Sequence, residues 1–540
     1  MVPSVCRMQN QLAERLDPIC REKRLVFCGA VRWLAIVTVL VGMIERQAIC
    51  AEIQDPVLNL LLKKGVVSEE EAHSAQVEAD AIRTNGVMPS SESKWKISNG
   101  LKNVELYGDV RTRFEYRSVQ DPNGGDIELK RFRLAVRLGL RGEAFDNFYY
   151  GVRLDTASNP RSPWVTLGTS SSGTPYQGPF GKSTFGINVG QGYLGWRGLD
   201  WLDISVGKFP NPLYTTTMVW DSDLNPEGAT EKFKYTVGEA NFFATLGQFV
   251  YQDTNPSKTS PGYFNLGYDS SNPLFLLAWQ AGVDYHITKK LSAKVAPALY
   301  NYTGHGQNVT SGLNFAPDFS GTFVGQGTTN GIAGVPASSS GFPNGAFDGF
   351  AANQTGINDL LVLDIPWEIN LKLDPVNLRL FGDYAQNLQG NHRAEGAYAA
   401  SHSAVLSGVG LVPISSAQTH DVTAYQIGLA IGSKDSLGLV TGSTSKRHAW
   451  EVRTYWQHVE QYALDPNLLD SDFFEGRGNL EGIYAAAAYG FTDNVIGTVR
   501  YGTATRINDK LGTGGSNQDI PQMNPIHRYN ILQLDLSLRF

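Results

Sequence analysis

The stretch YNILQLDLSLRF, from Tyr529 to Phe540, decides the fold. A period of two places every second side chain on the same face of a β-strand. This stretch therefore predicts a strand with one apolar and one polar face, the pattern of a wall that separates lipid from water. The apolar face carries Leu532, Leu534, Leu536, Leu538 and Phe540, and the polar face carries Gln533, Asp535, Ser537 and Arg539.

The same alternation opens the region after residue 95. From Val104 to Arg117, residues such as Leu106 and Phe114 alternate with charged residues such as Glu105 and Arg113. These runs are longer than the about 5–6 residues of an ordinary strand and exceed the about 9–11 that cross a bilayer at a tilt. Sixteen such segments are predicted, near 104–117, 129–141, 147–156, 185–197, 201–208, 229–238, 241–251, 275–286, 291–303, 359–373, 376–387, 421–432, 448–460, 480–490, 494–504 and 528–540. The predicted fold is all-β, a transmembrane antiparallel β-barrel of about 16 strands, an even number as such barrels require.

The first 51 residues have the features of a cleavable signal peptide. Basic residues from Arg21 to Arg32 precede an apolar run from Trp33 to Ile44, and Ala48 and Ala51 follow at a plausible cleavage site. The run is too short to cross a bilayer as a helix. All four cysteines (Cys6, Cys20, Cys28 and Cys50) lie in this segment, so the cleaved chain would contain none. A barrel behind a signal peptide predicts a location in the cell outer membrane.

The connections between the predicted strands alternate between short and long. Tight connections such as 143–147, 198–201 and Asp374-Pro375 fit turns on the periplasmic side, and the long Gly- and Ser-rich ones fit external loops. The connection from Ser433 to Arg447 is too long for a simple turn. An error there would change the strand number to 14 or 18.

Residues 52–95 predict a short periplasmic helical segment before the barrel at 96–540. Asp55 is placed to cap a helix that has Pro56 at its first position and ends at Gly65. Ser68 and Glu71 have the spacing of a capping box for a second helix. The segment is either without a chemical role or a contact site for a partner or the cell wall.

Composition excludes several classes of function. A mean hydropathy of −0.22 is too low for a bundle of membrane helices, whereas a barrel strand shows lipid only half of its side chains. The whole chain has a net charge of −7, and the first 51 residues hold seven basic and four acidic side chains, which leaves about −10 on the rest. This acidic balance argues against nucleic acid as a partner.

Enzymatic and other β-rich alternatives have little support in the sequence. The nine histidines are scattered without metal-ligand spacing, and no Gly-x-Ser-x-Gly or phosphate-loop motif occurs. His448 and His458 lie near predicted strand ends, where a catalytic role and a polar rim position are both open. No catalytic residue, metal ligand or cofactor is predicted. A plugged transporter would need over a hundred residues before the first strand, and a soluble β protein would not need such long strands.

Three stretches resemble a putative porin family of Gram-negative bacteria. They are 58–67 (LNLLLKKGVV), the Arg-rich opening strands, and a loop with GKFPNP at 207–212 and VWDSDLNPEG at 219–228. The resemblance implies a passive outer-membrane channel in contact with lipid, and a homotrimer by analogy with general porins. The strand that ends at Phe540 resembles the signal that the barrel assembly machinery reads.

The loop 209–228 is the third long loop of the predicted topology, the one that narrows the lumen in general porins. It carries Asp221, Asp223 and Glu227. Opposed acidic and basic walls in a narrow aqueous pore would create a transverse field that favours polar solutes. The basic wall is predicted to consist of Arg111, Arg113, Arg131, Arg133, Arg137 and Arg153.

The alternative for the arginine face is ordinary lining of a wet lumen. An Arg facing lipid costs about 2–4 kcal/mol at the bilayer midplane, so inward Arg is expected whatever the solute. The sequence leaves both interpretations open, with a slight preference for anions at the constriction. A barrel enzyme and a substrate-specific channel with a plugged lumen remain as alternative functions.

Overall fold

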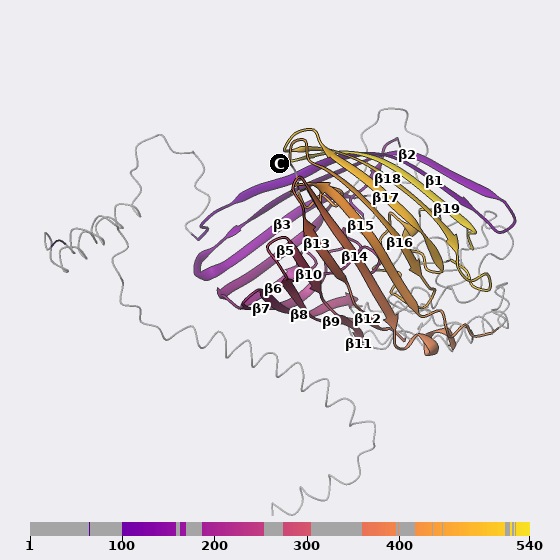
Figure 1. Ribbon diagram of the computed structural model, residues 1–540, viewed down its shortest axis with the longest axis horizontal. Helices are drawn as coiled ribbons and strands as arrows, with labels where there is room; N and C mark the ends of the chain where they lie inside the picture. The colour runs from indigo at the N-terminus through magenta and orange to yellow at the C-terminus, as the bar shows by residue number, and fades with distance from the viewer. Residues whose placement is uncertain are drawn as a thin grey trace, which may run out of the picture. The chain divides into compact units, whose positions relative to one another are not determined.

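The computed structural model describes one closed antiparallel barrel (Figure 1). The described residues are 64, 100–157, 162–168, 186–252, 274–303, 359–395, 398, 416–434, 436–444, 446–513, 519–520, 523 and 525–540. Residues 1–96 form a separate unit from the barrel at 97–540. The predicted signal peptide (1–51) and helical segment (52–95) lie outside the described residues, apart from Lys64.

The barrel wall is a 19-stranded sheet that closes because β1 pairs with both β2 and β19. The strands are β1 (Glu105–Gln120), β2 (Asp126–Glu143), β3 (Phe148–Ala157), β4 (Val165–Thr166), β5 (Gly186–Leu199), β6 (Leu202–Lys208), β7 (Glu227–Val237), β8 (Ala240–Gln252), β9 (Leu274–His286), β10 (Leu291–Val295), β11 (Ala298–Thr303), β12 (Leu361–Asp364), β13 (Trp367–Lys372), β14 (Val376–Asn387), β15 (Thr423–Ser433), β16 (Trp450–Val459), β17 (Leu480–Gly490), β18 (Val495–Arg506) and β19 (Arg528–Arg539). Two 3-10 turns are described, η1 (Phe145–Asn147) and η3 (Phe474–Gly476).

These segments form sixteen wall strands, as predicted. β10 and β11 are one strand interrupted at Pro297, and β12 and β13 are one strand interrupted at Pro366. Proline has no N–H for the ladder, which is why the pairing breaks at these points. The two-residue β4 pairs only with Arg133 and Leu134 of β2, beyond the end of β3, and adds no wall strand.

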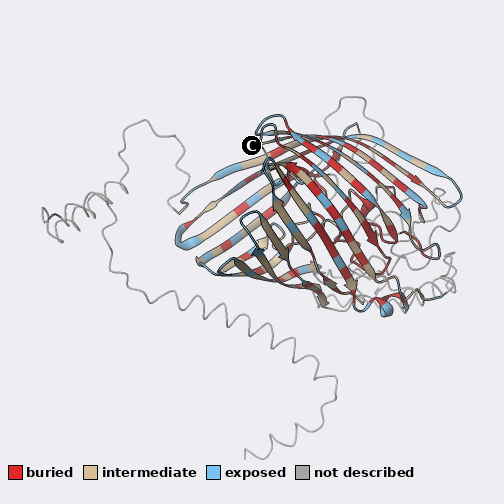
Figure 2. Ribbon diagram, viewed as in Figure 1, coloured by how far each residue is buried: buried red, intermediate tan, exposed pale blue. Residues whose placement is uncertain are grey.

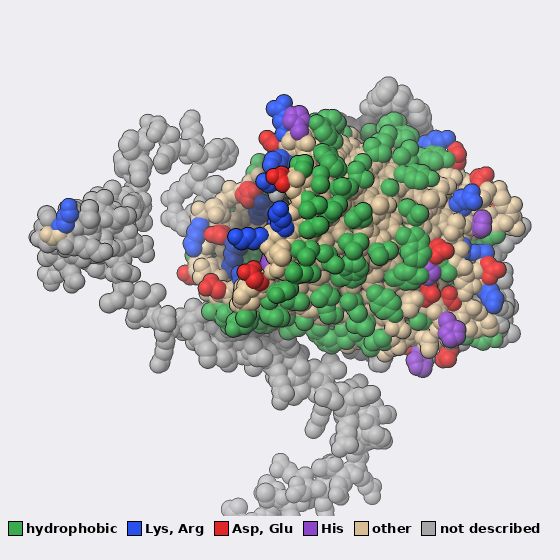
Figure 3. Space-filling model, viewed as in Figure 1, with side chains coloured by type: hydrophobic (Ala, Val, Ile, Leu, Met, Phe, Trp, Pro, Cys, Tyr) green, Lys and Arg blue, Asp and Glu red, His purple; other side chains and the backbone are tan. Residues whose placement is uncertain are grey.

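The side chains alternate between the two faces of the wall. In β19, Leu534, Leu536 and Leu538 point outward and are 44–50% exposed, while Gln533 and Asp535 point inward and are buried. Figure 2 shows the resulting stripes along the strands, and Figure 3 shows hydrophobic side chains covering much of one outer face. Both follow from a wall that faces lipid outside and polar groups inside. No helix among the described residues is long and apolar enough to span a bilayer.

The last residue completes the closure of the barrel. Phe540 donates its backbone N–H to the carbonyl of Gly108 (3.1 Å) and accepts one from Gly108 N–H (2.9 Å). The Phe540 ring lies over Gly108, where a Cβ atom would come within 2.9 Å of the ring and 2.4 Å of the Arg137 carbonyl oxygen. An aromatic ring thus covers a glycine at the seam between the first and last strands.

The two ends of the barrel differ in the length of their connections. At the short-turn end, connections such as Asp200–Trp201 and Gly238–Glu239 have two residues. The long-loop end carries, among its described loops, L3 (209–226) and L7 (460–479). The connection 434–449 is the long exception at the short-turn end. Its described residues add no strand, which confirms the count of sixteen.

Candidate functional site

L3 lies inside the barrel and not above it. Its side chains Phe209, Met218 and Trp220 are buried against the inner wall. The Trp220 ring packs edge-on against Phe249 of β8, with centroids 6.0 Å apart, and lies 6.4 Å from Tyr300 of β11. Burial of these apolar side chains on one side of the lumen fixes L3 across it.

L7 folds inward from the opposite side and meets L3. The backbone N–H of Asp221 donates to the Leu468 carbonyl (2.6 Å), and Asp470 N–H donates to the Thr217 carbonyl (3.3 Å). The Asp221 carboxylate accepts hydrogen bonds from both the N–H (3.1 Å) and the hydroxyl (2.9 Å) of Ser471. The two loops therefore form one internal structure.

A third segment enters from the short-turn end. We call residues 434–449 the inverted loop. The buried Glu451 of β16 accepts the N–H groups of Gly438 (2.8 Å) and Val440 (2.9 Å), and Arg500 of β18 donates to the Val440 carbonyl (3.2 Å). Arg539 also donates to the carbonyl of Gly442. These bonds hold the inverted loop inside the lumen, where unpaired backbone groups would be costly.

The three inserted segments and the wall enclose a cavity of about 140 Å³, which we call the constriction cavity. The wall contributes four arginines and the loops contribute four aspartates. The arginines are Arg111, Arg113, Arg453 and Arg500, and the aspartates are Asp221, Asp223, Asp470 and Asp472. The remaining lining is aromatic or small and includes Trp164, Tyr455, Tyr484, Val440 and Thr441.

The wall arginines are held by fixed partners. Arg113 makes two bonds to Asp535 of β19 (2.7 and 2.9 Å) and a third to Asp472 of L7 (2.7 Å). Arg111 pairs with Asp109, with 2.7 Å between Nε and Oδ2. Both guanidinium groups lie over the buried ring of Trp164, at 5.1 Å for Arg111 and 4.2 Å for Arg113. Such pairing fixes the positions of charges that would otherwise sample many rotamers.

The loop carboxyls differ from one another in protonation. Burial and the nearby Asp223 raise the pKa of Asp221 to about 7. Burial and the charges of Asp221 and Asp472 hold the pKa of Asp470 well above its ordinary value. Burial also opposes the charge of Asp472, but Arg113 and Arg117 outweigh it and lower the pKa of that carboxyl. Near pH 7, Asp472 is ionised while Asp221 carries less than full negative charge, and the pKa of Asp470 is shifted in the same direction as that of Asp221.

The structure brings four of the predicted site residues together in the constriction cavity: Arg111, Arg113, Asp221 and Asp223. Arg137 lies beside them, with its Nη1 3.5 Å from an Asp223 carboxylate oxygen and its Nε 2.7 Å from Asp109.

The other predicted residues lie elsewhere. Arg131 and Arg133 surround the buried Glu115 closer to the long-loop end, and Arg131 also pairs with Asp519. Arg153 pairs with Asp155 on its own strand (2.7 Å). Glu227 is the first residue of β7, where it is exposed and pairs with Lys208, so it is not brought to the constriction cavity.

Sequence reasoning missed L7, the inverted loop, Arg453 and Arg500. One signal for L7 was available in the sequence. The tripeptide Asp-Ser-Asp occurs at 221–223 in L3 and again at 470–472 in L7. The two copies are the segments that meet at the constriction cavity.

The two histidines near strand ends have ordinary polar partners. His458 lies 2.9 Å from a Glu481 carboxylate oxygen and 3.6 Å from Glu460, and its ring stacks on Tyr425. His448 hydrogen-bonds the Tyr489 hydroxyl (2.8 Å). No group of three or more His, Cys, Asp or Glu side chains in the described part of the chain is placed to hold a metal ion.

A family model described as putative porin matches residues 123–540. No curated protein matches the sequence.

Solved structures with a similar fold include three porins and channels. OmpF from Salmonella typhi, in complex with daunomycin, is 9% identical, with 82% of this chain and 99% of that chain covered and a TM-score of 0.40. The anion-selective porin from Comamonas acidovorans is 9% identical, with 81% and 99% covered and a TM-score of 0.37. The outer-membrane channel DcaP of Acinetobacter baumannii is 11% identical, with 83% and 100% covered and a TM-score of 0.37.

Proposed function

This chain belongs to the putative porin family, and from that membership we propose that it lets small hydrophilic solutes and ions diffuse passively through its lumen. The family and the closed barrel indicate an outer-membrane channel rather than an enzyme. In our proposal L3, which corresponds to the predicted loop 209–228, narrows the channel together with L7 and the inverted loop. The passage is the constriction cavity.

The proposal rests above all on the opposed charges of the constriction cavity. Arg111 and Arg113 project from β1, while Asp221 and Asp223 belong to L3. Fixed positive and negative groups on opposite sides of a narrow, low-dielectric passage create a transverse field. Dipolar and charged solutes align in such a field, whereas apolar solutes would have to displace ordered water. The field therefore selects for polarity without a chemical step.

The arginines of the predicted basic wall divide into two groups in this proposal. Arg111, Arg113 and Arg137 act on the solute, because each lies at the constriction cavity or contacts one of its aspartates. Arg131, Arg133 and Arg153 brace the wall, because their contacts are with carboxylates of the wall or of a neighbouring loop. In this proposal the first group sets selectivity and the second group is ordinary lining of the wet lumen.

We propose a preference for anions at the constriction. The raised pKa values of Asp221 and Asp470 reduce the negative charge of the loops, while the arginines stay charged. Arg111 Nη2 and Arg453 Nε are buried without a hydrogen-bond partner in the described part of the chain.

A second candidate is a substrate-specific channel. It is favoured by the inverted loop, which enters the lumen from the short-turn end and meets L3 and L7 at the same cavity. Three inserted segments leave a smaller passage than one loop would. A passage of this size would restrict transport to small solutes that match its charges.

Export, assembly and oligomeric state complete the proposal. Residues 1–51 would be removed as a signal peptide, and the barrel assembly machinery would recognise the strand that ends at Phe540. The outer hydrophobic face would contact outer-membrane lipid, and the barrels would associate as homotrimers. Chemical cross-linking of the protein in native membranes, followed by gel electrophoresis, tests the trimer.

Liposome swelling tests passive diffusion directly. The protein without residues 1–51 is refolded into liposomes loaded with dextran, and swelling is recorded in isotonic solutions of neutral sugars of increasing size. We expect swelling whose rate falls steeply with solute size. Folded, heat-modifiable protein that produces no swelling with any solute would refute passive diffusion.

A further inference from the structure

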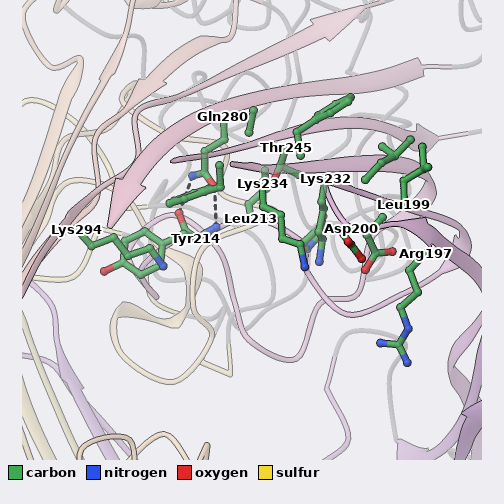
Figure 4. A pocket seen from close by; sticks show the side chains of 16 residues that line it. Arg197, Leu199, Asp200, Leu213, Tyr214, Lys232, Lys234, Thr245, Gln280 and Lys294 are labelled. Carbon is green, nitrogen blue, oxygen red and sulfur yellow. Dashed lines mark hydrogen bonds between the residues drawn. The ribbon is translucent and has the colours of Figure 1, made fainter. Parts of the chain in front are cut away.

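A second and larger cavity lies at the short-turn end, where the tip of L3 descends toward β7, β8 and β10. It has a volume of about 590 Å³ and is shown in Figure 4. We call it the lysine cavity, after Lys232, Lys234 and Lys294, which line it. Its apolar surface comes from Leu213 and Tyr214 of L3 and Phe243 of β8. The volume falls within the about 300–1,000 Å³ of small-molecule sites.

The cavity is held open by specific contacts. The Gln280 side chain of β9 donates to the Tyr214 carbonyl (2.8 Å) and accepts the Tyr214 N–H (2.8 Å). This pair of bonds, drawn as dashed lines in Figure 4, fixes the backbone of L3 above the cavity. Gln280 itself is buried, so the bonds are shielded from competing water. The roof of the cavity is therefore part of the folded structure.

None of the three lysines forms an ion pair within 4.0 Å with a carboxylate of the described residues. The arginines of the constriction cavity each form one, namely Arg111, Arg113, Arg453 and Arg500. The nearby acidic groups are Asp203 and Asp200 of the lining, and Asp284 and Glu368, which lie opposite Lys294 on its two neighbouring strands. Asp203 accepts a hydrogen bond from the Tyr149 hydroxyl, Glu368 pairs with Arg379 (3.4 Å), and Asp200 is exposed in a turn. These carboxylates offset part of the positive charge without a close ion pair. The lining still carries more basic than acidic side chains, with Arg197, Lys232, Lys234 and Lys294 against Asp200 and Asp203.

The lysines flank the apolar surface of the cavity. In Figure 4, Lys232 and Lys234 extend side by side, and Lys294 lies along the ring of Tyr214. The Lys294 ammonium is 3.7 Å from the centroid of that ring and 5.2 Å from the Phe243 centroid. An ammonium group that is partly withdrawn from water and forms no close ion pair gains from an anion brought to it.

From this arrangement we infer that the lysine cavity binds small organic carboxylates. The carboxylate would contact one or more of the lysine ammonium groups, and the apolar body would pack on Leu213, Tyr214 and Phe243. The inference extends the proposed function: solutes of this class would be held beside the constriction during passage. It differs from the field at the constriction cavity because the binding group is a lysine without a close ion pair and because an apolar body adds to the affinity.

Binding is measured on the refolded full barrel in detergent by isothermal titration calorimetry. This measurement needs no open pore, so its failure and the failure of the channel proposal are distinguishable. The probes are sodium benzoate, its neutral isostere benzamide, and inorganic phosphate. The variants are Lys232→Gln, Lys234→Gln and Lys294→Gln, with Lys232→Arg as the charge-conserving variant. Lys130→Gln is the matched control, because Lys130 is exposed and already paired with Glu128 (2.7 Å). Heat-modifiable migration confirms that each variant is folded.

We expect benzoate to bind more tightly than phosphate, and benzamide to give no measurable heat. At least one of the three Lys→Gln variants should weaken benzoate binding about tenfold, with Lys130→Gln unchanged and Lys232→Arg close to the wild type. Benzoate binding that is unaffected in all three folded variants would overturn the inference. Equal binding of benzoate and phosphate would overturn the contribution of the apolar surface and leave a site for anions in general.

Discussion

Asp221 and Ser471, 250 positions apart in the chain, join the two loops inside the barrel. Asp221 Oδ2 accepts both the N–H and the hydroxyl of Ser471, and the other oxygen, Oδ1, accepts the N–H of Asp223 (2.9 Å). Asp221 and Ser471 belong to the two Asp-Ser-Asp copies. In L7, Asp470 likewise accepts the N–H of Asp472 (3.2 Å). The first Asp of each copy thus accepts a backbone hydrogen bond within its own loop. Asp221 also binds Ser471 of the other loop.

The first prediction concerns the hydrogen bonds between Asp221 and Ser471. Ser471→Ala removes the hydroxyl donor but keeps the backbone N–H, so we expect a loosened contact between L3 and L7. The free energy of unfolding should fall by about 1 kcal/mol, the typical value for one hydrogen bond. Single-channel recordings should show larger current fluctuations. Ser222→Ala is the control, because Ser222 occupies the same place in the other copy and is exposed. Equal stability and equal current fluctuations in the two variants would contradict a stabilising bond between Ser471 and Asp221.

The second prediction concerns pH. The groups that face Asp221 are Asp223 of its own loop and Asp470, Ser471 and Asp472 of L7. Because the pKa of Asp221 is raised to about 7, its carboxyl gains a proton as pH falls from 8 to 6. The constriction then becomes less negative, so the preference for chloride over potassium should rise.

Asp221→Asn provides the control for this pH effect. The variant should hold the acid-form selectivity of the wild type throughout pH 6–8, since the side chain can no longer ionise. A wild-type selectivity that does not change over this range, or a variant that keeps the full change, would show that another group is responsible.

The third prediction concerns Arg113. It is 3% exposed and binds Asp535 and Asp472. Its removal leaves Asp535 with Arg500 alone and Asp472 without its closest basic partner. Breaking a buried ion pair in this way costs about 3–5 kcal/mol. Arg113→Ala should therefore lower the temperature at which the barrel loses heat-modifiable migration. Arg141→Ala, at an exposed pair with Glu105, should leave it unchanged. Loss of heat-modifiable migration at the same temperature in both variants would contradict this prediction.

The fourth prediction concerns the seam. Gly108→Ala would place a Cβ 2.4 Å from the Arg137 carbonyl oxygen and 2.9 Å from the Phe540 ring. We expect a lower yield of folded barrel, because the backbone at the junction of β1, β2 and β19 has no room to shift. Gly192→Ala is the control, since its nearest neighbour would be at 3.7 Å, an ordinary contact. Refolding yields on a gel compare the two, and equal yields would refute tight packing at the seam.

The wall could be predicted from the sequence because each strand residue faces one of two environments, the lipid or the lumen. Leu534 and Asp535, for example, lie on opposite faces since one face meets lipid and the other the lumen. The two interrupted strands did not disturb the count, because Pro297 and Pro366 break the ladder without reversing the chain.

The site could be predicted only in part, because loop burial depends on tertiary contacts that have no periodicity. The position of their loop predicts Asp221 and Asp223. It also predicts Glu227, but β7 begins at that residue and Lys208 binds it. Arg453 and Arg500 occupy inward positions on late strands, but single arginines there gave no ladder pattern. In the sequence, the inverted loop differs from the other short-turn connections only in its length. What holds it is the buried Glu451, whose two backbone partners no sequence rule identifies.

The reversal potential and single-channel conductance of the refolded protein in a planar bilayer, under a KCl gradient, test the central claim most directly. An open channel with arginines fixed at its narrowest point predicts discrete conductance steps and an anion-favouring potential. Neutralising Arg111 should shift that potential toward cations. Folded, heat-modifiable protein that gives no steps would contradict an open channel, and steps with a cation-favouring potential would contradict the role of the arginines.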